Sequence, residues 1–212
     1  VALRNLKRAE EALACYDKAV AILPGYANAW DNRGVALLDL KRPAEALACF
    51  DKAVAFQPGH ADAWNNRGFA LKLLKRPEEA LASIEKTIQL NPGSAAAWSN
   101  RCATLHDLRR LEEALVCASK ALALRPDDAN AWNNHAAVLL DLNRPDEAAA
   151  SSARAMAIDP DHEFILGHYL QNKMRACDWE GLAENLARCA AGIEAGRNVI
   201  APFTLLGLMD DP

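Results

Sequence analysis

The sequence contains no apolar run long enough to cross a membrane. A spanning helix needs about 20 consecutive apolar residues, and no stretch of the 212-residue chain approaches that length. Basic charge is not in excess either: 24 Lys and Arg face 28 Asp and Glu, the formal net charge is −4, and no block of like charges occurs. This balance does not favour binding to nucleic acid. We therefore expect no membrane and no nucleic acid among the partners.

The motifs of common catalytic and metal sites are also missing. The chain has no Gly-rich phosphate loop and no Cys-x-x-Cys pair, and no His stands at a metal-ligand spacing from a Cys. The five His are scattered, which disfavours a nucleophilic pair. We expect no cofactor, no metal ion and no catalytic residue, so this chain by itself is not predicted to be an enzyme.

The six cysteines follow no disulfide pattern. Cys15, Cys49 and Cys117 recur at one slot of an internal repeat, and Ser83 and Ser151 occupy that slot in the other copies. A slot shared by Cys and Ser favours a small side chain. We expect reduced structural thiols, and hence a cytoplasmic protein, because that compartment keeps thiols reduced.

The repeat has a constant period of 34 residues. Its marker is Trp-x-Asn-Arg at 30–33, and the tryptophans that follow it are Trp64, Trp98 and Trp132. With Trp at the fourth position, the full units are 27–60, 61–94, 95–128 and 129–162. Residues 1–26 align with the back two-thirds of an earlier unit. Because the chain starts partway through a unit and without Met, we expect it to be a fragment.

Each unit is predicted to form two helices. Positions four, eight, eleven and fourteen of a unit are apolar or small, which is the spacing of one helical face. The first helices are expected at 28–41, 62–75, 96–109 and 130–143, with Asn28, Asp62, Ser94 and Asn130 as N-caps. A Pro at the first turn and a Pro after the last turn bound the second helices. These are expected at 44–57, 78–91, 112–125 and 146–158.

This period, with its Trp, Gly, Leu, Ala and Pro positions, resembles the tetratricopeptide repeat over residues 1–162. A single helix pair cannot bury its apolar stripe alone, so such pairs stack on one another. The resemblance implies an all-α fold, a right-handed superhelical solenoid of helix pairs. The tryptophans are expected to lie in its core.

Residues 163–212 depart from the repeat. Helices are predicted at about 163–176 and 179–195, with Asp178 as a cap and Gly196 as a stop, and we interpret them as capping helices followed by a linker. Met174-Arg175-Ala176-Cys177-Asp178-Trp179, Pro202-Phe203 and Asp210-Asp211-Pro212 resemble the repeat-to-catalytic junction of bacterial O-linked N-acetylglucosamine transferase-like glycosyltransferases. That resemblance implies a missing catalytic region after the repeats.

A row of asparagines is the candidate for function. On a helical wheel with Trp at zero, positions two, six, nine and thirteen fall at about 140° to 200°, on the face opposite the core. An Asn amide carries both a donor and an acceptor, so it can pair with a peptide unit, and the second resemblance implies such a ladder in a concave groove. The predicted peptide-binding groove comprises Asn32, Asn66, Asn100, Asn134, Asn28, Asp62, Asn65, Asn130, Asn133, Lys72 and His106.

Other interpretations stay open. The ladder amides can instead bond to a neighbouring repeat, and Arg33, Arg67 and Arg101 are expected to pack their stems and reach water or an acidic neighbour. A clamp for a C-terminal carboxylate would need a full set of basic residues around the asparagines, and the sequence does not contain one. The function predicted is a protein–protein interaction module for extended peptide, serving as the recognition arm of a glycosyltransferase. The alternative is a stand-alone scaffold or chaperone adaptor, and self-association remains open for either.

Overall fold

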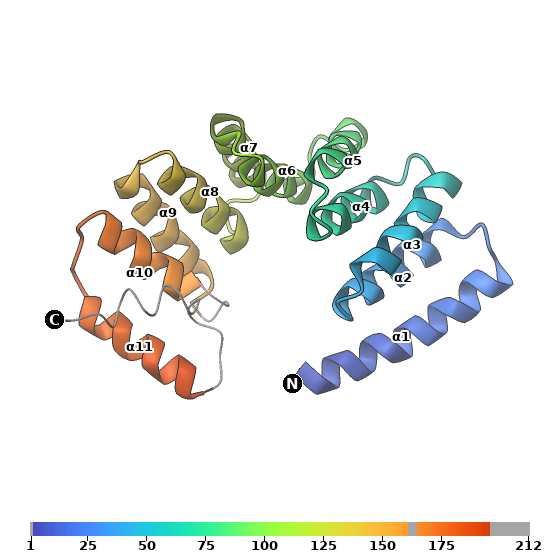
Figure 1. The fold of residues 1–212 in the computed structure, drawn as a ribbon, viewed down its shortest axis with the longest axis horizontal. Coiled ribbons are helices and arrows are strands. Elements are labelled where there is room, and N and C mark those ends of the chain that lie inside the picture. Colours follow the sequence, from blue (N-terminus) through green and yellow to red (C-terminus); the bar gives the residue numbers. More distant parts are fainter. Residues whose placement is uncertain (1, 161–164, 196–212) are drawn as a thin grey trace. The chain divides into compact units, whose positions relative to one another are not determined.

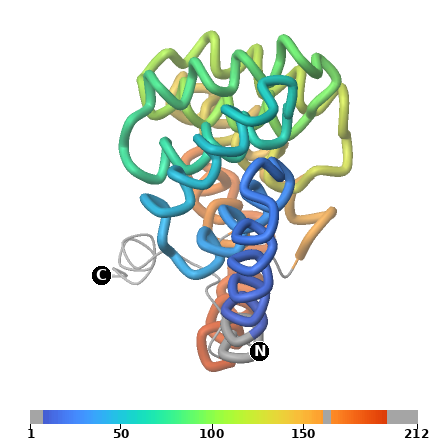
Figure 2. Tube along the Cα trace, turned by 90° about the vertical axis from the view of Figure 1, so that its right-hand side faces the viewer, coloured from blue at the N-terminus to red at the C-terminus, as the bar shows by residue number. Residues whose placement is uncertain are grey.

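The structure is a computed structural model in which the backbone of residues 2–160 and 165–195 is described, with side chains from residue 8 onward. Those ranges contain eleven α-helices and no strand (Figure 1). Short turns join most successive helices, and Figure 2 traces the chain through them. The predicted all-α fold class is confirmed.

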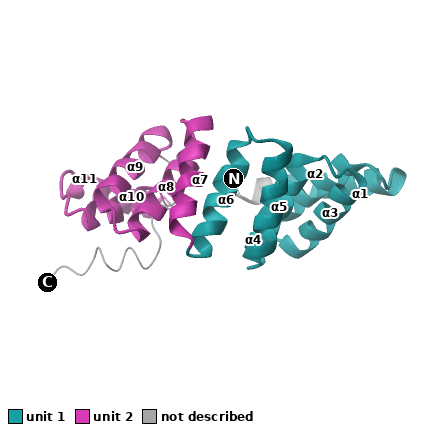
Figure 3. Ribbon diagram, turned by 90° about the horizontal axis from the view of Figure 1, so that it is seen from above, with its two compact units in different colours: residues 1–109 teal, residues 110–212 magenta. Residues whose placement is uncertain are grey.

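The chain divides into two compact units, Val1–Arg109 (unit 1) and Arg110–Pro212 (unit 2), coloured separately in Figure 3. Unit 1 contains α1 (Ala2–Ile22), α2 (Ala27–Asp39), α3 (Pro43–Phe56), α4 (Ala61–Leu73), α5 (Pro77–Leu90) and α6 (Ala95–Asp107). Unit 2 contains α7 (Leu111–Leu124), α8 (Ala129–Asp141), α9 (Pro145–Ile158), α10 (Ile165–Arg175) and α11 (Leu182–Glu194).

Within unit 1 each helix packs against the next one in the chain. The first helices of successive repeats also touch, because α2 contacts α4 and α4 contacts α6. The second helices α3 and α5, both fully described, do not contact each other. The stack in unit 1 is therefore closer on the side of α2, α4 and α6, which places these three helices on the inner side of its curve.

The turn inside each repeat uses a residue in the left-handed region. After α2, the amide of Arg42 donates to Leu37 O and the amide of Lys41 to Leu38 O, each at 2.9 Å, which is the Schellman pattern. The left-handed residues, with φ of 58° or 59°, are Lys41, Lys75, Arg109 and Asn143. Pro43, Pro77 and Pro145 then occupy the first turn of the second helices, as predicted.

The predicted N-caps are wrong in three repeats. The first helices begin at the alanine before Asn28, Asp62 and Asn130, so these residues lie inside the first turn. The caps stand just before that alanine, where His60 Nδ1 accepts from an amide at 3.3 Å and Asp128 Oδ1 at 3.0 Å. Ser94 caps α6 as expected, while Tyr26 before α2 makes no side-chain cap bond.

The tryptophans lie at the edge of the core rather than inside it. Each indole is half-buried, and its Nε1 donates to the carbonyl of the Pro six residues earlier, at 2.7 to 3.0 Å. This bond satisfies the indole donor, which would be costly to bury without a partner. The tryptophans were expected in the core, and Trp30, Trp64 and Trp132 do pack against buried clusters, at their edge. The indole hydrogen bond also links the end of the preceding second helix to the next repeat.

Deeper in the core, the residue at position eight of each unit, on the first helix, packs against the residue at position twenty-four, on the second helix. These positions are called slots eight and twenty-four. Gly34 lies directly under the buried ring of Phe50, and Gly68 lies under Ile84. Where slot eight is larger, as at Cys102 and Ala136, slot twenty-four is the small Ala118 or Ser152. The first two full repeats thus set a Gly against a large side chain, and the next two set two small side chains against each other.

The last helices complete an apolar cluster of unit 2. Ile165, Leu166 and Leu170 of α10 pack with Cys189 of α11 and with Met156 of α9. Asp178 was predicted to cap α11, but the helix starts at Leu182 after Gly181. Asp178 instead accepts from Lys173 Nζ at 3.1 Å. Gly196 and the linker 196–212 lie outside the described residues.

Candidate functional site

The candidate surface of unit 1 is the side of α2, α4 and α6 that points away from the second helices. We call it the inner face. All of its side chains are at least partly exposed. It comprises Asn28, Asn32, Val35, Asp39, Asp62, Asn66, Phe69, Leu73, Ala96, Asn100, Ala103 and Asp107.

Two ladder asparagines tie neighbouring first helices together. Asn66 Nδ2 on α4 donates to Asp31 Oδ1 on α2, at 3.0 Å. Asn100 Nδ2 on α6 donates to Asn65 Oδ1 on α4, also at 3.0 Å. Both bonds span 35 positions, so the side chain at slot six reaches slot five of the preceding repeat. The structural interpretation of the ladder therefore holds for one hydrogen of each amide.

The ladder keeps unused hydrogen-bonding capacity. Among the described residues, the side-chain oxygens of Asn66 and Asn100 have no hydrogen-bond partner, and each amide nitrogen has a second hydrogen. Asn32 is exposed and makes no side-chain hydrogen bond there. A ligand can therefore use all of the Asn32 amide and the carbonyl oxygens of the other two.

Asp31 is an unusual carboxylate beside this ladder. Its residue is only 8% exposed, and burial raises the pKa of its carboxyl above the usual range. The Asn66 hydrogen bond and the charge of His60 lower that pKa, while nearby Asp62 raises it further. Only Oδ1 has a hydrogen bond in the described part of the chain, so Oδ2 can accept a hydrogen bond from a ligand.

Three large apolar side chains lie exposed on the inner face. Val35, Phe69 and Leu73 are 38%, 37% and 47% exposed. The predicted groove omitted them because apolar residues at slots nine and thirteen were not treated as contacts. Their signal was present in the sequence: a Phe on the wheel face opposite Trp is unexpected for a residue that serves only the core.

The remaining predicted groove residues of unit 1 take different positions. Lys72 on α4 and His106 on α6 are half-buried at slot twelve, at the flank of the face, and Asn65 at slot five is engaged by Asn100. Asn28 and Asp62 are exposed in the first turns of α2 and α4. Asn28 and Asp62 therefore belong to the inner face without capping a helix as predicted, and Asn65, Lys72 and His106 border that face.

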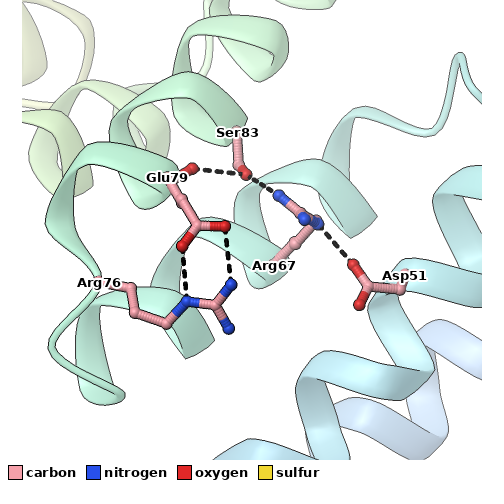
Figure 4. Close-up of polar contacts among 5 residues, drawn as sticks. All are labelled: Asp51, Arg67, Arg76, Glu79 and Ser83. Atoms are coloured by element: carbon pink, nitrogen blue, oxygen red, sulfur yellow. Dashed lines mark hydrogen bonds and ion pairs between the residues drawn. The ribbon is translucent and has the colours of Figure 1, made fainter.

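The repeated arginines face away from this surface. Arg67 Nε donates to Asp51 on α3 at 2.7 Å, and its Nη1 donates to Ser83 on α5 at 2.6 Å (Figure 4). Arg33 makes the same pair of contacts, with Asp17 at 2.7 Å and Cys49 Sγ at 2.8 Å. The slot shared by Cys and Ser is therefore small and also accepts a hydrogen bond, which the sequence analysis missed.

A second arginine in each repeat is bonded within its own turn. Arg76 Nε and Nη2 reach the two carboxylate oxygens of Glu79 at 2.6 and 2.7 Å (Figure 4). The bidentate pair lowers the pKa of the Glu79 carboxyl, chiefly through this hydrogen bond. The same pairing joins Arg42 to Glu45 and, in unit 2, Arg144 to Glu147. These cations are thus used in the fold and are not offered to a ligand.

Unit 2 continues the ladder with a histidine. His168 on α10 stands 34 positions after Asn134, and its Nδ1 lies 3.0 Å from Asn133 Oδ1 on α8. This is the slot-six to slot-five contact seen in unit 1. Burial lowers the pKa of the His168 imidazole. Asn130 is exposed, and Asn133 and Asn134 are half-buried. The 34-residue spacing from Asn134 was the signal in the sequence for this position.

Residues 2–160 and 165–195 contain no cluster of three or more His, Cys, Asp or Glu side chains that could hold a metal ion. None of the six cysteines forms a disulfide. No helix in these ranges is long and apolar enough to cross a membrane.

Comparison with known families agrees with this geometry. Three family models, each described as a tetratricopeptide repeat, match residues 27–60, 61–94 and 103–163, which together are 129 of 212 residues. The first two matches coincide with repeats of the 34-residue period. No curated protein sequence matches the chain.

Several solved structures share the fold. PilW, described as a widely conserved type IV pilus biogenesis factor, has a TM-score of 0.78 at 19% identity, with 94% of this chain and 96% of that chain covered. TTC0263, described as a thermophilic TPR protein of Thermus thermophilus, has a TM-score of 0.68 at 22% identity, covering 82% and 94%. YrrB, described as a TPR protein with an unusual peptide-binding site, has a TM-score of 0.60 at 22% identity, covering 81% and 89%.

Proposed function

The chain belongs to the tetratricopeptide repeat family, and from that premise we propose that it is a protein-interaction module whose inner face in unit 1 holds an extended peptide. Stacked repeats of this kind use an extended surface for binding. One solved structure of the same fold, YrrB, is described as having a peptide-binding site. The observation that carries the proposal is the free hydrogen-bonding capacity of Asn32, Asn66 and Asn100 on three adjacent helices.

The spacing of the ladder suits an extended chain. Packed helices lie about 8–10 Å apart, and an extended peptide advances about 3.3 Å per residue. Each rung therefore meets a peptide unit about every third residue. At each rung an Asn oxygen accepts from a peptide N–H, and a free amide hydrogen donates to a peptide carbonyl. Recognition through the backbone makes little demand on the ligand's side chains at these points.

The proposal is tested best at Asn32. Its side chain is exposed and has no hydrogen bond within the described residues, so Asn32→Ala should leave the thermal midpoint unchanged. The affinity for a peptide selected by display against the wild-type chain should fall about fivefold, the equivalent of one net hydrogen bond of about 1 kcal/mol. Fluorescence polarisation measures this change.

Two further variants frame that measurement. Asn66→Ala should weaken binding and also lower stability by about 1 kcal/mol, because it removes the bond to Asp31. Gln89→Ala removes an amide from α5, away from the inner face, and should change neither quantity. If Asn32→Ala binds the selected peptide as tightly as the wild type, the ladder does not hold the ligand.

We also propose a place for this module in a larger protein. The resemblance of residues 174–179 and 202–212 to the junction of O-linked N-acetylglucosamine transferase-like enzymes supports a role as the recognition arm of a glycosyltransferase. The expectation of reduced structural thiols supports a cytoplasmic location. Sequencing the gene beyond the codon for Pro212 tests the first point: an α/β catalytic region supports the transferase, and an early stop favours the stand-alone scaffold.

A further inference from the structure

We propose that the segment held by unit 1 is basic and carries one bulky apolar side chain. This inference rests on the proposed function and adds the chemistry of the partner to it. Two independent features of the inner face lead to it: an exposed apolar patch made of Val35, Phe69 and Leu73, and a surplus of carboxylates around that patch.

The apolar patch has a position that core packing does not explain. Phe69 and Leu73 are four residues apart on α4, so their side chains are neighbours on one side of the helix. Val35 occupies on α2 the slot that Phe69 occupies on α4, one helix away. The other large exposed apolar residues of unit 1 lie at the last turns of second helices or in the loops after them: Ile22, Leu23, Tyr26, Phe56 and Leu90.

Carboxylates surround the patch without cations to balance them. Asp39, Asp62 and Asp107 are exposed on the inner face and form no ion pair among the described residues. Lys72 is the one Lys or Arg on the inner face or at its flank slots five and twelve, within the described part of unit 1. The potential over this face is therefore negative, which favours a basic partner and repels an acidic one.

The outer arginines do not neutralise this charge. Each repeated arginine of unit 1 is already bonded to an acidic side chain on or between the second helices. These pairs are Arg33–Asp17, Arg42–Glu45, Arg67–Asp51, Arg76–Glu79 and Arg101–Glu85. The two charge systems are thus separate, and the inner-face carboxylates are available to a ligand.

Asp31 gives the basic group a specific acceptor. The residue is almost fully buried between α2 and α4, and Oδ2 keeps no hydrogen bond within the described ranges. An ammonium or guanidinium group of the ligand placed there would form a charge-assisted hydrogen bond, which is stronger than a neutral one. At the same slot the next repeat has the neutral Asn65, so the charge of this position is particular to α2.

The test uses the full 212-residue chain and three labelled peptides on one Ser/Pro background. Peptides of about ten residues extend to about 33 Å, which exceeds the roughly 20 Å across three packed helices. The first carries one Phe and three Lys, the second one Phe and three Glu, and the third three Lys with Ser in place of Phe. Affinities are measured by fluorescence polarisation at low and high salt, with NMR titration to millimolar peptide.

We expect the first peptide to bind at least about tenfold more tightly than the second, and the margin should shrink with salt. The affinity of the first peptide should exceed that of the third by about fivefold or more, because the third lacks the Phe side chain that acts as a buried anchor. Phe69→Ser should remove most of that anchor effect, and Asp62→Asn should weaken binding about two- to fivefold at low salt. Phe56→Ser and Glu78→Gln make the same chemical changes on second helices and should bind as the wild type does.

Two outcomes separate this inference from the proposed function. If the Glu peptide binds as well as the Lys peptide and its affinity depends on Asn32, the inner face binds peptide but its partner is not basic. If the Lys peptide binds with an affinity that ignores Phe69→Ser and Asp62→Asn, the basic segment docks elsewhere and the inference is wrong. If none of the three peptides shifts the NMR signals of the inner face at millimolar concentration, both this inference and the proposed function are wrong.

Discussion

The packing of Gly34 against Phe50 leads to a prediction about stability: Gly34→Ala should destabilise the wild-type chain and stabilise a chain in which Phe50 is already replaced. A Cβ on Gly34 would lie 2.4 Å from Phe50 Cε1 and 2.7 Å from Cζ, well inside van der Waals contact, and the ring is fully buried. Overpacking of this kind costs about 1–3 kcal/mol. Replacing Gly by Ala inside a helix returns about 1 kcal/mol. Gly34→Ala should therefore destabilise the wild-type chain by up to about 2 kcal/mol.

The same substitution should stabilise a chain that already carries Phe50→Ala. That background loses about 3–5 kcal/mol through the cavity it creates. The added methyl group then meets open space, fills part of the cavity and gains the helix propensity, for a stabilisation of about 1 kcal/mol. The double variant also resembles the combination of two small residues present at Ala136 and Ser152. The coupling between the two sites should be about 1–3 kcal/mol.

Urea denaturation followed by far-UV circular dichroism measures this cycle. Whole curves should be fitted with nearest-neighbour terms, because repeat arrays depart from two-state unfolding. Gly59→Ala is the control, since a Cβ there meets nothing within 4 Å. If Gly34→Ala stabilises the wild-type chain, or destabilises both backgrounds equally, the small-against-large account of the repeat core is refuted.

Three further predictions concern the turns, the arginines and the ladder. Lys75→Gly should stabilise by up to about 1 kcal/mol because φ is 59° there, and Asn143→Gly should gain less because Asn tolerates that region. Arg67→Lys should cost about 1 kcal/mol in urea unfolding by losing one of the two bonds in Figure 4. His168→Asn should keep a bond to Asn133 but remove part of the acid sensitivity. Burial lowers the pKa of His168 below 6.5, so the unfolded state binds more protons and the wild type loses stability as pH drops below about 6.5. The variant should lose less stability over the same range, and the remaining loss comes from groups such as His135, whose pKa burial also lowers.

Much of the fold is predictable from local rules. Pro43, Pro77 and Pro145 locate the second helices, and the repeat period locates the first helices to within one or two residues. The N-caps were misplaced by two residues because an Asn or Asp in the first turn resembles a cap, while Tyr26 and His60 at the cap position give no such signal. Asp178 was misassigned for a different reason: its partner Lys173 lies on the preceding helix.

The site was predictable only in part. The wheel places Asn66 and Asn100 opposite the tryptophans correctly, because that depends on helical geometry alone. Their bonds to Asp31 and Asn65 depend on the register of two stacked helices, which no local pattern carries. The half-buried position of the indoles also escaped, because hydrophobicity ranks Trp as core while its N–H requires an acceptor.

The most direct measurement follows the asparagine side chains themselves. In a titration of the isotope-labelled chain with a display-selected peptide, NMR resolves the side-chain amide of each Asn. The account predicts shifts for Asn32, Asn66 and Asn100, with no shift for Asn91, which lies after α5 and bonds to its own turn. Saturable binding that leaves those three amides unchanged would contradict the claim that the inner face of unit 1 holds the peptide.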